Sequence, residues 1–405
     1  MNLTFRRPPG WLVAVLVCQV GVQVAVSISR PVTSYRLVAA GFDATVVGLV
    51  AAAFAVPPML LALPLGRFSD RASTPIVVAG CLITSIAALG LSLSTSVAVL
   101  AVSTGLLGIG HLGTVVGTQS LVAQSSLGRS RMSMFGMLTA AASIGQMIGP
   151  ALGGIIAQPG SGSPTLTSTG VSLRVAAGFA LVALPAALVL HARSPRSPQA
   201  GPAGPARRLS IRQLLTTAGM PAALMSSFGS KGASDMLLTY LPLLGVSIGL
   251  SAGRVGVFLS LSAAAAIVAR FAMPALLARV SPRPVVIWST AFSGLTIACM
   301  PLVSSGWSLG PIMVALGFML ALSQTISMVW VASVAPDGSE GAALGLRLAT
   351  NRVGQVATPS LAALVAGVSG LLGVFWMLSA LMGVASASTW LSRPRGMEQD
   401  GPLGY

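Results

Sequence analysis

Long apolar stretches, separated by short polar segments, dominate the pattern of this chain. A helix that crosses a bilayer needs about 20 consecutive, mostly apolar residues. Stretches of this kind predict twelve spans, at 11–37, 44–65, 76–94, 97–123, 131–157, 172–191, 213–246, 252–275, 284–304, 308–332, 341–367 and 370–391. Some are long enough to require tilt or a kink, which Pro31, Pro150, Pro242 and Pro359 would supply. The pattern predicts an all-α membrane protein.

The composition agrees with this class and excludes others. Hydrophobic residues make up 54% of the 405 residues and charged residues only 7%, with a mean hydropathy of +0.88. A soluble domain carries about a quarter charged residues, so a soluble enzyme, a disordered scaffold and a nucleic-acid-binding domain are excluded. Cys18, Cys81 and Cys299 all lie in apolar stretches, which predicts small core residues and no disulfide framework.

The net charge of +16 records topology. Fifteen of the 23 basic residues fall in the two termini and in the segments that follow even-numbered spans, whereas three fall on the opposite side. Basic residues concentrate in cytoplasmic loops of membrane proteins. We therefore expect a multi-pass protein of the plasma or inner membrane with both termini in the cytoplasm, and no nucleic-acid partner.

The chain divides into two similar halves. Residues 193–212 are rich in Pro, Gly, Ala and Arg, which predicts a solvated cytoplasmic linker. The stretch at 145–157 aligns with that at 354–366, so Gln355 and Pro359 repeat a pattern of the first half. We expect six-helix bundles at 1–192 and 213–392 and a cytoplasmic tail at 393–405. Such a duplication places a substrate site between the halves, near the bilayer midplane.

Two motifs stand out at the ends and within the spans. The predicted loop after the second span contains Gly66, Asp70 and Arg71. Asp70 could cap a neighbouring helix N-terminus through its dipole and pair with a nearby arginine, or it could be a solvated loop charge. Arg129 and Arg279 are further candidate gating residues. The fifth span contains a string of small residues at Gly145, Gly149, Pro150, Gly153 and Gly154. These residues allow close helix packing and a bend, and simple Gly-x-x-x-Gly packing is the alternative.

Together these motifs resemble the major facilitator superfamily. The loop resembles its signature between helices 2 and 3, and the string in helix 5 is similar to a motif of its drug:proton antiporters. The resemblance implies twelve helices in two pseudo-symmetric six-helix bundles, transport by alternating access, gating by Asp70 and an interface sealed by the helix-5 glycines. The loop lacks the family's usual following basic residues. Thr104 stands where the family often has an arginine that is linked to proton coupling.

Polar side chains follow single faces of several spans. Gln19, Gln23, Ser27, Arg30 and Ser34 share a face of the first, and His111, Thr114 and Thr118 share a face of the fourth. Gln324 and Ser327 precede Trp330 in the tenth span. Polar stripes in lipid must face protein or water, and in the resembled fold these helices line the cavity. Arg30 could clamp an anionic substrate or extend to the outer headgroups.

Lys231 and Asp235 form an i,i+4 pair in the seventh span, and Asp235 is the only carboxylate in the middle of any predicted span. Embedded ionisable residues cost about 2.5–3.5 kcal/mol on insertion scales and are usually functional. One hypothesis is that Asp235 binds and releases a proton while Lys231 alternates between Asp235 and substrate. A self-neutralising structural pair is the alternative. His111 is the next candidate proton carrier, or a packing group.

The predicted function is secondary transport, most simply proton-coupled export of a small amphipathic compound that is neutral, zwitterionic or anionic. The alternative in the same class is a proton-linked importer or facilitator of an organic anion or sugar. A membrane-embedded receptor or enzyme is the different-class alternative, but the sequence offers neither a catalytic cluster nor a signalling domain. We expect no cofactor, no bound metal and a monomer in the lipid bilayer.

Overall fold

The computed structural model describes residues 10–125, 128–158, 163–193, 211–303, 307–336 and 339–392. Within these ranges the chain is helical and contains no strand. The first six helices are α1 (Gly10–Ala39), α2 (Ala44–Ala53), α3 (Val56–Leu93), α4 (Val97–Ser125), α5 (Gly128–Ala157) and α6 (Leu166–Arg193). The others are α7 (Ile211–Leu215), α8 (Met220–Ser247), α9 (Ala252–Leu277), α10 (Pro282–Cys299), the 3₁₀ turn η1 (Met300–Leu302), α11 (Leu309–Val334) and α12 (Glu340–Leu391).

Prolines explain two departures from the predicted boundaries in the first half. The predicted helix at 44–65 is broken at Phe54–Ala55, because the rings of Pro57 and Pro58 clash with the carbonyls four residues before them. The segment from Gly66 to Arg71, predicted to be a loop, is helical. It belongs to α3, whose direction changes at Ala72 (φ −144°, ψ 53°), just after the carbonyl that Pro75 would meet.

The second half also departs from the predicted boundaries. The predicted helix at 213–246 is divided into α7 and α8, because Gly219 takes a left-handed conformation (φ 86°) before α8 begins. The last two predicted helices form one hydrogen-bonded element, α12, which breaks direction at Gly370 (φ 65°, ψ −162°). The predicted linker is outside the described residues from 194 to 210, as is the tail from 393 to 405.

The number of spans is compatible with twelve. Ten helices of the described part are long and apolar enough to cross a bilayer, and one of them is the 50-residue stretch from Ala342 to Leu391. At 1.5 Å per residue, such a stretch is about 75 Å long, which is enough for two crossings. Helix α8, which carries Lys231 and Asp235, is not among the ten, although its 28 residues are sufficient in length.

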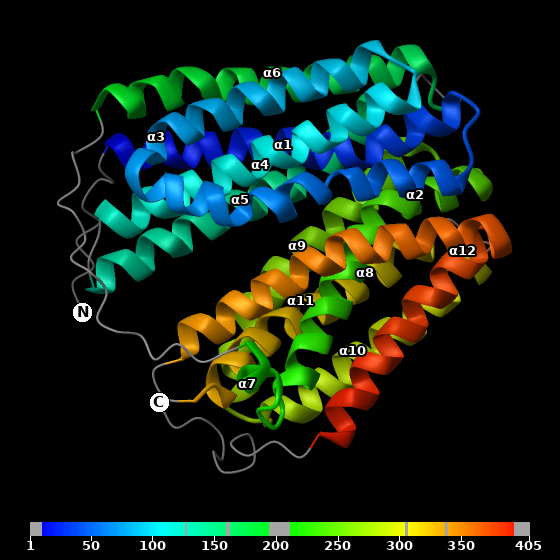
Figure 1. The fold of residues 1–405 in the computed structure, drawn as a ribbon. Helices are drawn as coiled ribbons and strands as arrows, with labels where there is room; N and C mark the ends of the chain where they lie inside the picture. The colour runs from blue at the N-terminus through cyan, green and yellow to red at the C-terminus, as the bar shows by residue number, and fades with distance from the viewer. Residues whose placement is uncertain are drawn as a thin grey trace.

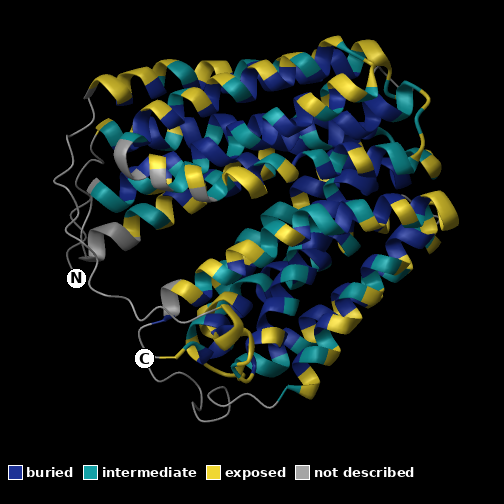
Figure 2. Ribbon diagram, viewed as in Figure 1, coloured by how far each residue is buried: buried dark blue, intermediate teal, exposed yellow. Residues whose placement is uncertain are grey.

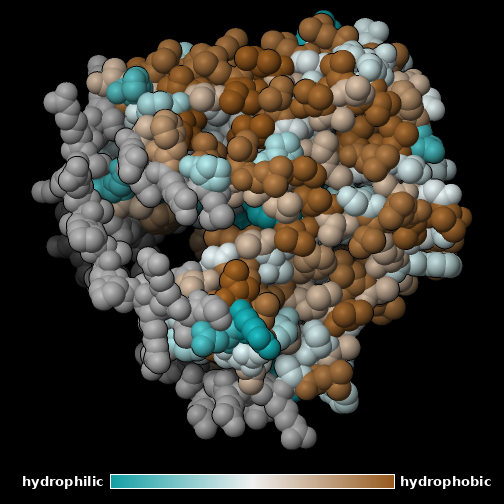
Figure 3. Space-filling view, viewed as in Figure 1, coloured by the Kyte–Doolittle hydropathy of each residue, from teal (hydrophilic) through white to brown (hydrophobic). Residues whose placement is uncertain are grey.

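The helices form two bundles, one of α1–α6 and one of α7–α12 (Figure 1). The bundles meet at the right of the view, where α5 packs against α9, α2 against α12 and α1 against α8. They diverge at the left, where α1 begins and α6 ends. Between the diverging ends, the surface is hollowed (Figure 3). The protein is therefore closed on one side and open on the side where the N-terminal bundle begins and ends.

Small residues make the contact between the bundles close. A Cβ atom at Gly154 of α5 would lie 3.2 Å from the Cα of Gly256 in α9, and one at Gly48 of α2 would lie 2.9 Å from the Cβ of Ala363 in α12. The two contacts are equivalent in the internal repeat, because positions 48 and 256 correspond, as do 154 and 363. Duplication has thus produced two matching helix crossings at the closed side.

The outer faces of both bundles are exposed and apolar (Figures 2 and 3). Val368 is 90% exposed, Phe271 81% and Leu93 76%. Such broad apolar surfaces are unusual in soluble proteins and suit contact with lipid. Cys299, which the sequence predicts to be a core residue, is exposed on this type of surface, whereas Cys18 and Cys81 are buried.

Candidate functional site

A cavity of about 200 Å³ lies between the two bundles. Residues from α1, α4, α5, α8, α9, α11 and α12 line it, so neither bundle forms it alone. Its polar lining includes Gln23, Arg30, His111, Lys231 and Asp235. Leucines and Phe54 provide apolar walls. The combination of apolar walls and a few converging polar groups is typical of small-molecule sites.

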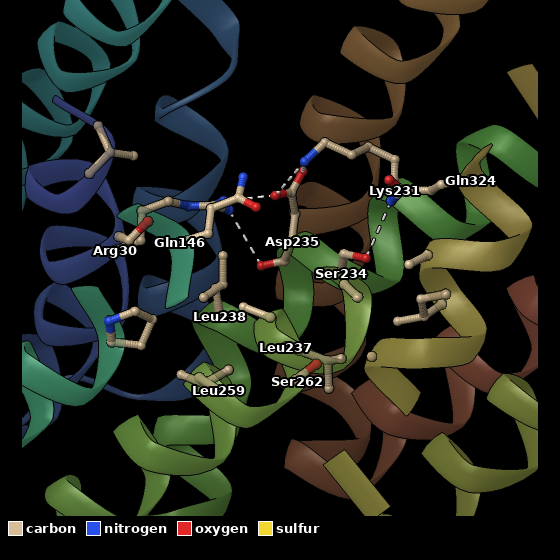
Figure 4. A pocket seen from close by; sticks show the side chains of 18 of the residues that line it. Arg30, Gln146, Lys231, Ser234, Asp235, Leu237, Leu238, Leu259, Ser262 and Gln324 are labelled. Atoms are coloured by element: carbon tan, nitrogen blue, oxygen red, sulfur yellow. Dashed lines mark hydrogen bonds and ion pairs between the residues drawn. The ribbon is translucent and has the colours of Figure 1, made fainter. Parts of the chain in front are cut away.

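Asp235 lies at the centre of the polar groups and connects the bundles (Figure 4). Arg30 from α1 donates to Asp235 Oδ1 over 2.7 Å, and Lys231 lies 3.0 Å from the same carboxylate on the other side. Asp235 is 3% exposed, whereas the side chain of Lys231 is 32% exposed. The i,i+4 pair predicted from the sequence is therefore part of a triad, and its third member comes from the other bundle.

The second arginine of this network is on α12. Gln355 donates its Nε2 to Asp235 Oδ2 over 2.9 Å, and Arg352 Nη1 donates to Gln355 Oε1 over 2.9 Å. Gln355, predicted to be an interface residue, thus contacts the central carboxylate directly. Arg352 holds the amide with its NH₂ group directed at Asp235.

Arg30 lines the cavity and does not extend to the outer headgroups, and its role as a clamp for an anionic substrate stays a prediction. Its guanidinium is bound to a protein carboxylate and lies 4.9 Å from the ring centroid of Phe54. The side chain is 12% exposed and lies within the protein, so it does not extend to the headgroups. Ion pairing at this depth avoids the cost of an isolated charge.

The predicted stripes of α1 and α4 face each other. Gln23 Oε1 lies 3.1 Å from His111 Nε2, and both residues line the cavity. Gln19 accepts a hydrogen bond of 3.1 Å from Thr118, but neither residue is part of the cavity wall. The hydroxyl of Thr118 also bonds to a carbonyl of its own helix. The Gln19–Thr118 pair joins α1 to α4 in the packed interior.

Gln324 contributes to the cavity from α11. Its Nε2 lies 3.4 Å from the hydroxyl of Ser234 on α8, and its backbone carbonyl accepts a hydrogen bond of 2.8 Å from Arg347. Arg347 is itself buried. It ties α12 to α11 on the intracellular side of the predicted topology.

Among the cavity residues that were not predicted from the sequence, two have large polar side chains. Gln146 lines the cavity from α5, one position after the first glycine of the helix-5 motif. Arg270 lines it from α9, where it donates to Ser143 Oγ of α5 over 3.0 Å. Each is an isolated polar residue in an apolar stretch, and this isolation was the signal in the sequence that could have identified them.

The helix-5 residues lie at two interfaces. Cβ atoms at Gly145, Gly149 and Gly153 would press against α1, at 2.7 Å from Gln23 Cβ in the first case. A Cβ atom at Gly154 would overlap the Ala252 carbonyl of α9. Pro150 lies inside α5 and lines the cavity, and its repeat equivalent Pro359 lies inside α12.

The predicted gating residues lie within α3, just before its change of direction at Ala72, at the start of α5 and in the turn after α9. Gly66 has no atom within 4 Å of a Cβ position, and Arg279 is exposed in the turn after α9. The side chains of Asp70, Arg71 and Arg129 are outside the described part of the structure. Their gating role therefore stays a prediction.

The family model of the Major Facilitator Superfamily matches residues 15–337 and 223–402. The chain belongs to the Major Facilitator Superfamily. The resemblance inferred from the sequence motifs is therefore confirmed at the level of the superfamily. No curated protein sequence matches the chain.

Solved transporters of the superfamily share the fold. A point mutant of the nucleoside transporter NupG has a TM-score of 0.76 at 14% identity, covering 94% of this chain and 99% of its own. A D-xylose-proton symporter has a TM-score of 0.74 at 14% identity, covering 97% and 99%. A bacterial homologue of the human lysosomal transporter Spinster, in an inward-facing and unoccupied conformation, has 0.72 at 15% identity, covering 95% and 97%. At these identities the likeness concerns the fold alone.

Metal chemistry has no support in the described ranges of this superfamily member. Within them, no three or more His, Cys, Asp or Glu side chains gather where they could hold a metal ion. His191, the second histidine, bonds to Thr74 at 2.9 Å and lies away from the cavity residues. The chemical capability of the site is ion pairing and hydrogen bonding, which suits binding and release.

Proposed function

We propose that the chain is a secondary active transporter that carries a small amphipathic compound by alternating access and couples this movement to protons. The observation that supports this best is the Arg30–Asp235 ion pair, which crosses between the two bundles inside a shared cavity. A bond of this kind holds the bundles in one arrangement until a ligand or proton weakens it. Proton binding and substrate binding can then both change the equilibrium between arrangements.

Asp235 is the proposed proton site. Among the cavity residues that the structure describes, it is the one carboxylate. Protonation would neutralise its charge and weaken the ion pairs with Arg30 and Lys231. The cross-bundle link would then open at the residue that carries the proton. His111 is the reserve candidate, and its contact with Gln23 would position it for proton exchange.

The proposed topology places the open side of the cavity in the cytoplasm. It follows from the distribution of basic residues, with both termini cytoplasmic, a plasma or inner membrane location and a linker at 193–212 between the bundles. The protein would work as a monomer, since one chain forms the whole cavity. Asp70 would latch the cytoplasmic ends of the bundles when the cavity closes on that side.

Export is the direction that the helix-5 motif supports, through its similarity to drug:proton antiporters. A second candidate is a proton-linked importer or facilitator of an organic anion or sugar. The cavity favours the anion in this case, because Arg30, Lys231 and Arg270 outnumber Asp235. Both candidates use the same site and the same alternating movement, and they differ in how proton and substrate are loaded.

A screen in proteoliposomes tests the proposed function. Purified protein is reconstituted with a pH-sensitive dye inside, and small neutral, zwitterionic, anionic and cationic compounds are added outside. We expect at least one compound to move protons across the membrane only in the presence of the protein. Protein-free liposomes and protein locked by a crosslink across the closed side are the controls. Absence of any compound-dependent flux in either direction would contradict the proposal.

A further inference from the structure

Positively charged side chains outnumber carboxylates around the cavity, and they approach Asp235 from several helices. Arg30 approaches it from α1, Lys231 from its own helix α8, and Arg352 through Gln355 from α12. His111 lines the cavity from α4, and Arg270 from α9. Four permanent cations therefore accompany one carboxylate in this part of the described structure. Buried cations without matching anions are costly in a membrane, which makes the unmatched ones candidates for ligand binding.

Arg270 is the clearest of these unmatched cations. It lines the cavity, and the partner that the structure gives its guanidinium is the neutral hydroxyl of Ser143. Arg36, by contrast, is a buried arginine with a structural role, since its three nitrogens donate to the carbonyls of Ser92, Ser94 and Leu166. A guanidinium that faces a cavity offers a planar fork which fits a carboxylate.

The carboxylate of Asp235 already pairs with two of the other cations, Arg30 and Lys231, as an anionic ligand would. Its carboxylate oxygens lie 2.7 Å from Arg30 and 3.0 Å from Lys231, as a bound carboxylate ligand would. A ligand carboxylate that binds Arg30 or Lys231 must compete with Asp235 for them. The displaced Asp235 then loses the partners that stabilise its charge, and a proton can neutralise it. Anion binding and proton binding therefore favour each other, and this coupling is reciprocal.

We propose that the cavity takes a small amphipathic organic carboxylate, held by Arg270 and by the cations released from Asp235, and that it loads this anion together with a proton on Asp235. This rests on the proposed function and selects its second candidate, in which anion and proton move in the same direction. The apolar walls, including Phe54, Leu237 and Leu259, would contact the rest of the molecule. The volume of about 200 Å³ is below the roughly 300–1,000 Å³ of drug-sized sites, which suits a small compound.

Binding to the purified 405-residue protein tests the proposal. Two matched trios serve as probes: phenylacetate, phenylacetamide and phenethylamine, and hexanoate, hexanamide and hexylamine. Each compound is titrated while thermal unfolding is measured, and the shift of the midpoint gives an apparent affinity. We expect a carboxylate to bind more tightly than its amide and its amine. Uptake of one proton should tighten carboxylate binding by up to about tenfold for each pH unit lowered between pH 8 and pH 6.

Variants assign the effects to residues. Asp235→Asn, which mimics the protonated acid, should bind the carboxylate more tightly than wild type at pH 8 and lose the pH dependence. Arg270→Gln should weaken carboxylate binding by roughly tenfold or more at every pH. Arg254→Gln on the same helix is the matched control, because Arg254 stacks on Trp307 at 5.3 Å outside the cavity lining. His111→Gln should retain the pH dependence, which separates this histidine from Asp235.

Four results would overturn the proposal. The first three are tightest binding of an amine, equal binding of a carboxylate and its amide, and no binding of either trio. The fourth is weaker carboxylate binding by Asp235→Asn than by wild type. Asp235→Glu keeps a carboxylic acid at this position and should keep the pH dependence. It is the control for whether a substitution at position 235 by itself disrupts folding. A protein that binds carboxylates but moves nothing in proteoliposomes would contradict the proposed function and leave this site intact. Proton-coupled transport of an amine would support the proposed function and contradict the carboxylate site.

Discussion

Gly154 on α5 should control which side of the protein is closed. In the present arrangement a Cβ atom at this position would overlap the backbone carbonyl oxygen of Ala252 and lie 3.2 Å from the Cα of Gly256. The obstructing atoms belong to the backbone of α9 and cannot turn away as a side chain could. Gly154→Ala must therefore push α5 and α9 apart, and with them the two bundles.

The expected size of the effect follows from the cost of overpacking. Forcing one methyl group into a close contact costs about 1–3 kcal/mol. A cost of about 2 kcal/mol changes the ratio of two conformations by roughly 30-fold, since each ~1.4 kcal/mol is a factor of ten. The clash exists only while α5 and α9 are in contact. The substitution should therefore favour the arrangement in which this side is open.

A disulfide across the closed side measures this change. Thr45 and Gly367 are on α2 and α12, and a Cβ atom at Gly367 would lie 3.4 Å from Thr45 Oγ1, so cysteines at both positions can be crosslinked. In a background without the three native cysteines, we expect Gly154→Ala to lower the crosslinking yield several-fold. Gly178→Ala on α6, where no atom lies within 4 Å, is the control. An unchanged yield with Gly154→Ala would refute the argument from close packing.

Further predictions concern the ion pairs, the predicted gate and the packing within one bundle. Arg30→Gln should lower stability by about 1.5–3 kcal/mol in thermal unfolding, and its combination with Asp235→Asn should cost less than the sum of both; additive losses would argue against a direct bond. Asp70→Ala should increase cysteine labelling in the cytoplasmic cavity if the residue latches that side, and unchanged labelling would remove it from the gate. Gly149→Leu should destabilise the contact between α5 and α1 by about 1–3 kcal/mol in thermal unfolding, whereas Gly136→Leu, with no atom within 4 Å, should be neutral; equal effects would contradict the packing account.

The sequence pattern was sufficient for the class of protein and for local relations within helices. Apolar length predicts spans, because lipid requires them, and spacing places Lys231 and Asp235 on one helix face. The ends of the helices were harder to predict from the sequence, because they depend on competing local effects. The breaks at Phe54 and Ala72 follow from prolines that the span pattern alone does not weigh, and Gly370 changes direction within one element.

The contacts of the candidate site depend on the relative position of the two bundles. Arg30 and Asp235 are 205 residues apart, and no spacing rule places an α1 arginine against an α8 carboxylate. The same holds for Arg270, whose partner Ser143 belongs to the other half. Gln19 and Thr118 show the reverse case, because a polar face predicted to line the pathway is used up in helix packing.

The central claim is that Asp235 couples protons to transport through this cavity. The most direct measurement compares wild-type and Asp235→Asn protein in proteoliposomes with a labelled substrate and an internal pH dye. Wild type should accumulate substrate when a proton gradient is imposed, and the dye should report proton movement. Asp235→Asn should still exchange labelled for unlabelled substrate, yet should neither accumulate it nor move protons. Accumulation and proton movement at the wild-type rate in Asp235→Asn would contradict the account.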